Sequence, residues 1–77
     1  MRWDAELDAR GLLCPLPVLK ARKRLQGMAP GTVLRILCTD PAAHVDIPHF
    51  CDEAGHALLA SQPVDEAHCF LVRRGGE

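Results

Sequence analysis

The chain passes from a strand pattern into a helix pattern at Gly11-Leu12-Leu13-Cys14-Pro15-Leu16-Pro17, where one cysteine stands immediately before two prolines. Proline is tolerated in the first turn of a helix, because its missing N–H would have no intrahelical partner there and its fixed φ suits the helix. We therefore expect Pro15 and Pro17 in the first turn of a helix. Cys14 should lie at or next to the N-cap of that helix.

The predicted position of Cys14 favours a reactive thiolate. With prolines in the first turn, the main-chain donors near the sulfur are those of Leu16 and Val18, together with the positive end of the helix dipole. Such settings lower a cysteine pKa from about 8.5 to roughly 3.5–7.5, and the thiolate is the form that attacks sulfur, carbon or metal. The sequence thus predicts a sulfur nucleophile with a lowered pKa. The alternative is a small, inert apolar residue that ends a strand.

Hydrophobic periodicity outside this stretch predicts the remaining elements. Residues 3–7 alternate apolar and acidic side chains, which is typical of a half-buried strand, and Gly11 permits a turn with positive φ. Apolar residues recur at spacings of three and four over residues 16–28, which predicts a helix that ends at Gly27 or at residues 29–31. The pattern further predicts a strand over 32–38, a helix over 42–54, and a hairpin of segments 56–61 and 69–73. In the second helix Asp46 is the expected N-cap, Pro48 lies in the first turn and Gly55 ends the helix.

The order of elements is βαβαββ, and both helices are amphipathic. Each helix needs a sheet face on which to bury its apolar stripe, so we expect an α+β fold, a two-layer α/β sandwich. Its four-stranded mixed sheet would carry both helices on one face. Cys14 would then lie between the end of the first strand and the start of the first helix, where open α/β sheets hold ligands and anions are favoured.

Length and composition restrict the class of protein. A chain of 77 residues predicts one domain over residues 1–77, which buries only about 60% of the surface of its unfolded chain. The net charge of −1 argues against non-specific nucleic-acid binding. The sequence has no apolar run long enough to cross a bilayer and no signal-peptide pattern at its start, so we expect a cytoplasmic protein that does not bind membranes.

The four cysteines are expected to be free thiols. These cysteines are Cys14, Cys38, Cys51 and Cys69. They are too far apart in sequence to form any C-x-x-C pair, which argues against a structural zinc site and against a dithiol redox enzyme. We expect Cys38, Cys51 and Cys69 to be packing residues, and we expect no metal and no cofactor.

The chain resembles a known family. Residues 7–17 read Leu-Asp-Ala-Arg-Gly-Leu-Leu-Cys-Pro-Leu-Pro, which is similar to the L-D-x-R-G-L-x-C-P-x-P signature of the TusA (SirA-like) sulfur carrier proteins. The resemblance continues through a basic first helix, the Thr39-Asp40-Pro41 turn, residues 46–51 and residues 71–76, so it covers nearly the whole chain.

The resemblance implies a sulfurtransferase-type carrier with a covalent intermediate. Such a protein accepts a sulfane sulfur as a persulfide on Cys14 from a donor, a cysteine desulfurase in well-known members, and passes it to a downstream acceptor protein. In well-known members the sulfur reaches tRNA as 2-thiouridine, whereas similar proteins in sulfur-oxidising organisms serve dissimilatory sulfur metabolism. We accordingly expect protein partners, no direct contact with nucleic acid, and a monomer when the protein is free.

Other residues are candidates for supporting roles. Arg10 lies four residues before Cys14 and is predicted to contact a partner or the persulfide anion, while Gly11, Pro15 and Pro17 shape the loop. Asp8 is predicted to fix this loop by hydrogen bonds to the main chain. The first helix carries four basic residues that would steer an acidic partner or form a solvated face, and they are Lys20, Arg22, Lys23 and Arg24. The four histidines are expected at the surface.

Two other functions stay open from the sequence. One is a regulatory or interaction module in which Cys14 is a redox-sensitive helix cap. The other is a metal- or selenium-handling protein that uses Cys14 together with Cys51. The first predicts that replacing Cys14 leaves partner binding intact, and the second predicts bound metal that is lost when Cys51 is replaced.

Overall fold

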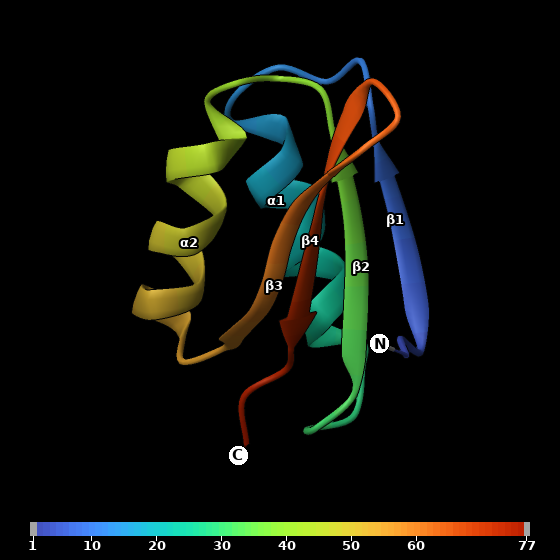
Figure 1. Cartoon of the computed structure of the whole chain (residues 1–77). Coiled ribbons are helices and arrows are strands. Elements are labelled where there is room, and N and C mark those ends of the chain that lie inside the picture. The colour runs from blue at the N-terminus through green and yellow to red at the C-terminus, as the bar shows by residue number, and fades with distance from the viewer. Residues whose placement is uncertain (1, 77) are drawn as a thin grey trace.

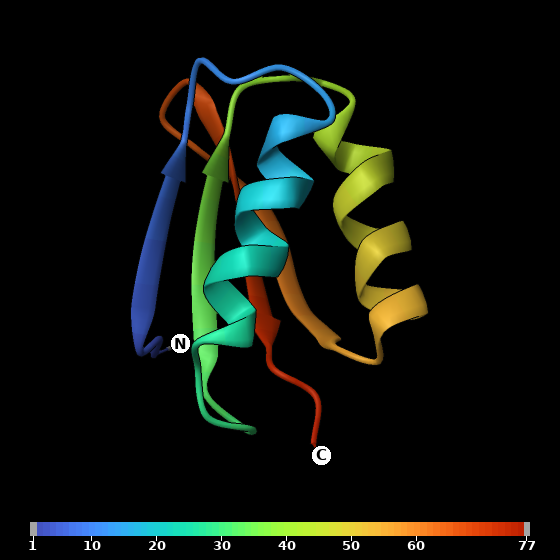
Figure 2. The same ribbon diagram turned by 180° about the vertical axis from the view of Figure 1, so that it is seen from behind.

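Two helices lie side by side on one face of a four-stranded sheet in the computed structural model, which describes residues 2–76 (Figures 1 and 2). The elements in chain order are β1 (Ala5–Ala9), α1 (Leu16–Gln26), β2 (Val33–Cys38), α2 (Ala43–Ala54), β3 (Ala57–Val64) and β4 (Ala67–Arg73). The predicted βαβαββ order and the two-layer α+β sandwich are therefore confirmed.

The strand order across the sheet is β1-β2-β4-β3. Strand β1 runs parallel to β2, while β4 is antiparallel to both β2 and β3, so the sheet is mixed. Because β1 and β2 are parallel, the loops that follow them leave the sheet at the same edge. This edge brings residues 10–15 alongside residues 39–42, and both helices begin there (Figure 1).

The main core lies between the sheet and the helices. Alternation along β2 turns Leu34, Ile36 and Cys38 toward α1 and α2, and β4 adds Phe70 and Val72 to the same layer. On the other face of the sheet a smaller cluster of Leu37, Cys69 and Leu71 is partly covered by side chains from β2 and β3. The predicted apolar stripe of the first helix faces this core, where α1 buries Pro17, Ala21 and Leu25.

The boundaries of three elements differ from the sequence prediction. The first strand spans Ala5–Ala9 rather than residues 3–7, and Trp3 instead lies with its ring 4.6 Å from the Arg35 guanidinium. The first helix ends at Gln26 with Gly27 as its C-cap, which confirms the first of the two predicted ends and leaves Met28 of the periodic stretch outside the helix. The hairpin strands are longer than predicted and are joined at Asp65 and Glu66. Strand β3 continues through Pro63 because β3 is an edge strand, where a proline does not have to remove a hydrogen bond of the sheet.

The prediction that Asp46 is the N-cap of the second helix is wrong. The N-cap is Ala42, and Asp46 lies in the first turn, while α2 runs unbroken through Pro48. The helix begins earlier because Asp40 organises the turn before it: its carboxylate accepts the N–H of Ala42 at 3.1 Å, and its carbonyl accepts the N–H of Ala43. At the other end Gly55 closes the helix at φ +79°, as predicted.

Neither of the helices described here has the length and apolar character needed to cross a membrane.

Candidate functional site

The thiol of Cys14 is exposed at the sheet edge where β1 gives way to α1. Pro15 is the N-cap of α1, and Pro17 is the second residue of the helix, with its ring buried. Cys14 therefore stands next to the N-cap, as the two prolines predict. The rigid residues on its C-terminal side limit how far the sulfur can move relative to the helix.

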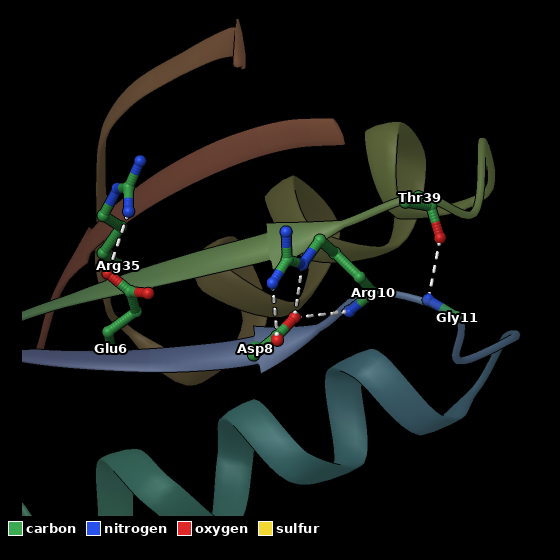
Figure 3. A network of polar contacts seen from close by, with 6 residues as sticks. All are labelled: Glu6, Asp8, Arg10, Gly11, Arg35 and Thr39. Carbon is green, nitrogen blue, oxygen red and sulfur yellow. Dashed lines mark hydrogen bonds and ion pairs between the residues drawn. The ribbon is translucent and has the colours of Figure 1, made fainter. Parts of the chain in front are cut away.

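Side chains from the segment after β2 fix the loop that carries Cys14. The N–H of Cys14 donates to the Asp40 carboxylate at 2.7 Å. The N–H of Gly11 donates to the Thr39 hydroxyl at 2.9 Å (Figure 3). Gly11 has φ +83°, a conformation that side chains other than glycine's adopt only at a cost. The loop that carries Cys14 is thus held by the segment after β2. The two segments are distant in sequence and lie side by side because β1 and β2 are parallel.

The acidity of Cys14 differs from the expectation. Interaction with the Asp46 carboxylate, partial desolvation and the negative charges of Asp46 and Asp40 raise the pKa of Cys14 above its ordinary value. The predicted lowering of this pKa is therefore wrong. One of the two expected main-chain donors is also occupied, because the N–H of Leu16 donates to the carbonyl of Leu13 at 2.9 Å.

The raised pKa keeps Cys14 in the thiol form at neutral pH. A thiol is far less nucleophilic than a thiolate, so the resting protein should react slowly with general alkylating and oxidising agents. The site therefore combines an exposed sulfur with low background reactivity.

Replacing Asp46 with asparagine should lower the pKa of Cys14, because the variant keeps an oxygen acceptor and loses the negative charge that disfavours the thiolate. We expect the midpoint of the pH profile for iodoacetamide alkylation to move to lower pH and the rate at pH 7 to rise several-fold. The exposed Asp52 of the same helix supplies a matched control, Asp52→Asn, which should leave the profile unchanged. An Asp46→Asn profile that stays in place or moves to higher pH would contradict this account.

Arg10 is paired with Asp8 along the first strand (Figure 3). Its guanidinium donates to both Asp8 carboxylate oxygens, at 2.8 and 2.9 Å, and its N–H donates to one of them at 3.1 Å. These bonds lower the pKa of Asp8 to about 2, the side-chain bond contributing most. The predicted role of Asp8 in fixing the loop is confirmed. Among the contacts of residues 2–76, Arg10 pairs with Asp8 and not with Cys14, so its contact with a partner stays a prediction.

The Arg10 side chain also lines an open cavity of about 740 Å³ on the sheet face away from the helices. Arg35 projects onto the same face, since Leu34 and Ile36 on either side of it pack under the helices, and it pairs with Glu6 at 2.8 Å (Figure 3). Both guanidinium groups are therefore already paired with carboxylates, Arg10 with Asp8 and Arg35 with Glu6, and Glu6 also lines the cavity.

The other three cysteines are buried free thiols, as predicted. Burial raises the pKa of Cys38 and of Cys51 to about 11, which keeps both protonated at physiological pH. Cys14 is thus the exposed cysteine of the four. Within residues 2–76, no three side chains of His, Cys, Asp or Glu lie together in a way that would hold a metal ion.

Two of the histidines are not plain surface residues. The rings of His44 and His68 lie 4.1 Å apart, and the His68 Nε2 is 2.6 Å from the Ser61 hydroxyl. His56 accepts the N–H of Gly75 through Nδ1 at 2.8 Å, which ties the C-terminal segment to the end of α2. Both His56 and His68 are half-buried, and desolvation lowers the pKa of each.

Asp40, Asp46 and Thr39 are the site residues that sequence reasoning missed. Thr39 and Asp40 follow β2 directly, so the prediction of two neighbouring parallel strands could have placed them beside the Cys14 loop. Asp46 carried no such signal, because its position was explained as a helix cap.

Comparison with known proteins identifies the family of the chain. The family model described as sulfurtransferase TusA matches residues 5–74. A solved structure of a SirA-like protein from Desulfitobacterium hafniense is 25% identical, superposes with a TM-score of 0.77, and its alignment covers 96% of this chain and 100% of that one. The chain therefore belongs to the TusA family, whose members take part in sulfur relay between protein partners.

Proposed function

We propose that this protein is a sulfur carrier that holds a sulfane sulfur as a persulfide on Cys14. The observation that supports this most directly is the single exposed thiol of the four, fixed on an anchored loop at the start of α1. A carrier needs one accessible sulfur and no thiol neighbour that would displace the cargo as a disulfide. The cysteines other than Cys14 are buried, and the residue at the usual C-x-x-C position is Pro17.

The loading step is an exchange between sulfurs. The Cys14 Sγ attacks the outer sulfur of a donor persulfide, so that a new S–S bond forms on Cys14 while the S–S bond of the donor breaks. The donor cysteine leaves as a thiolate and takes up the proton that Cys14 releases. One thiol and one persulfide enter, and one thiol and one persulfide leave, so the step needs no oxidant or reductant. Unloading to an acceptor thiol is the same exchange in reverse.

The raised pKa of Cys14 suits a carrier that must react with partners and with little else. Free in solution, the sulfur is held as a thiol by Asp46 and the neighbouring charge of Asp40. In a complex, the donor persulfide itself supplies the reacting sulfur next to Cys14, so proximity compensates for the small thiolate fraction. Because Pro15 and Pro17 already restrict the loop, little conformational entropy is lost when the partner binds.

We further propose a donor of the cysteine desulfurase type and a downstream protein acceptor. Thiolation of tRNA to 2-thiouridine, or a sulfur-metabolising pathway, is the proposed use of the sulfur, and the cytoplasm is the proposed location. In this proposal the protein contacts neither nucleic acid nor membranes directly and uses no cofactor or metal. The free protein is proposed to be a monomer of one domain.

The proposal is tested by intact-protein and peptide mass spectrometry after incubation with a cysteine desulfurase and cysteine, or with inorganic polysulfide, with reductant omitted from the last step. We expect the mass of one added sulfur atom on the Cys14 peptide, removable by a thiol. No added sulfur from either donor, on a folded protein whose Cys14 still alkylates, would instead support a regulatory module with a redox-sensitive cysteine.

A further inference from the structure

Exposed apolar side chains occur on the segments that meet at the Cys14 edge of the sheet. Five large apolar side chains are markedly exposed in the described chain, and four of them lie next to Cys14 or in the first turns of the two helices that begin at this edge: Leu13 at 69%, Leu16 at 44%, Leu19 at 52% and Val45 at 71%. We name these four residues the apolar collar. Leu13 precedes Cys14 directly, and Val45 precedes Asp46, whose carboxylate raises the pKa of the thiol.

Helix geometry places Leu16 and Leu19 on one exposed side of α1. Residues three apart in a helix are surface neighbours, so these two leucines form one patch over the first turn. The buried side of α1 is supplied by Pro17, Ala21 and Leu25. The collar leucines are therefore not needed for the core, which leaves their exposure without a structural reason in the isolated domain.

We propose that the apolar collar is the docking surface for the segment of a partner protein that surrounds its sulfur-bearing cysteine, and that this segment is apolar. The inference rests on the proposed function, because it concerns the same sulfur. Single exposed leucines are ordinary, but apolar side chains grouped around a reactive atom mark a contact surface.

The chemistry of transfer determines what must cover the collar. An S–S bond is about 2.05 Å long, so the partner sulfur has to come into contact with Sγ, and the residues beside Cys14 are then covered by the residues beside the partner cysteine. Apolar contacts there gain free energy by removing apolar surface from water. They also exclude water from the two reacting sulfurs.

The charges near the collar agree with an apolar segment at its centre. Asp40 and Asp46 lie beside the thiol, so an acidic segment at that point would be repelled. Lys20 and Lys23 follow Leu16 and Leu19 by four residues, which puts them one turn further along the same exposed side of α1. A partner segment that is apolar around its cysteine and acidic only at its edge is complementary to this distribution.

The test uses two short peptides with a central cysteine in mixed disulfide with 5-thio-2-nitrobenzoate. Leucines flank the cysteine in one peptide and serines in the other. Attack of Cys14 on the peptide sulfur forms a protein–peptide disulfide and releases coloured 5-thio-2-nitrobenzoate, so the rate is read directly. We expect the leucine peptide to react about tenfold faster, the ratio that ~1.4 kcal/mol of added contact gives.

The double variant Leu16→Ser, Val45→Ser should bring the two peptides to nearly equal rates without changing the rate of the serine peptide. Trp3→Ser is the matched control, since Trp3 is also exposed but lies at the other end of β1. Equal rates in the unchanged protein, or a preference that survives in the double variant, would overturn the proposal. A dimer in sedimentation that dissociates in the double variant would also overturn it, because a second copy would then cover the collar.

These outcomes are separate from those of the proposed function, because the peptide reaction involves no sulfane sulfur. A protein that prefers the leucine peptide but never takes up sulfur would retain the docking surface and lose the carrier proposal. A protein that takes up sulfur but reacts with both peptides at the same rate would support the carrier proposal and overturn the docking surface.

Discussion

Cys14→Ser is expected to abolish sulfur loading completely while the protein stays folded. A serine hydroxyl has no sulfur with which to hold a persulfide, and its oxygen is not a nucleophile at neutral pH without a base that activates it. The Cys14 side chain is exposed and its loop is anchored through the main-chain N–H, which the variant retains. The free energy of unfolding should therefore change by no more than about 0.5 kcal/mol, as for other surface substitutions.

The measurement compares sulfur uptake by mass spectrometry with thermal unfolding followed by circular dichroism. Cys51→Ala is the matched control, because Cys51 is a buried thiol whose pKa is raised to about 11 and which is not exposed to a donor. This variant should load sulfur as the unchanged protein does, with a modest loss of stability from the space left in the core. Uptake that persists in Cys14→Ser, or that vanishes in folded Cys51→Ala, would place the acceptor sulfur elsewhere.

The location of Cys14 could be predicted from the sequence because it depends on local rules. Prolines restrict the first turn of α1, Gly11 permits the preceding turn, and periodicity distinguishes the strand from the helix. Each of these signals lies within a few residues of the feature that it determines. For the same reason the order of elements and the two-layer sandwich were predicted correctly, although some strand ends moved by two or three residues.

The acidity of Cys14 could not be predicted in this way because it depends on tertiary neighbours. Local reasoning considers the helix dipole and the nearest N–H groups, and these favour a thiolate. The fold adds Asp46 from the first turn of α2 and Asp40 from the end of β2, and interaction with Asp46, partial desolvation and the charges of both carboxylates reverse the direction of the pKa shift. The sequence contains both residues but does not show that the fold brings them to the Cys14 loop.

Asp40 shows how tightly the site and the fold depend on one another. One of its carboxylate oxygens accepts the N–H of Cys14 at 2.7 Å, and the other accepts the N–H of Ala42 at 3.1 Å, at the start of α2. A single side chain therefore joins the loop before α1 to the turn before α2. This bridge brings Asp46 of α2 to the thiol on the α1 side, so the charge around Cys14 is set by the packing of the two helices.

Phe70→Ala is expected to cost a large part of the stability of the domain. Phe70 lies in β4 with no exposed surface and is the largest of the fully buried side chains in the described residues. It packs under the helices and also contacts the rings of His44 and His68, with ring centroids 6.0 and 4.8 Å away. Truncation of a buried phenylalanine to alanine costs about 3–5 kcal/mol, because contacts are lost and a cavity is left.

That loss is large for a chain of this size. At about 0.05–0.15 kcal/mol per residue, 77 residues give a free energy of unfolding of roughly 4–12 kcal/mol. Urea denaturation should therefore show a transition midpoint for Phe70→Ala that is lower by about 1 M or more, at an m value of about 1–3 kcal/mol per M. Phe70→Leu keeps most of the buried volume and should lose much less.

Trp3→Ala separates burial from aromatic character. Trp3 is 45% exposed and its main contact is with the Arg35 guanidinium, so its removal should cost about 1 kcal/mol or less. If Phe70→Ala lost no more stability than Trp3→Ala, the layer between β4 and the helices would not be the main source of stability. Since Asp46 reaches Cys14 only when α2 is packed on this layer, Phe70→Ala at low urea should also alkylate faster at Cys14 than the folded protein does.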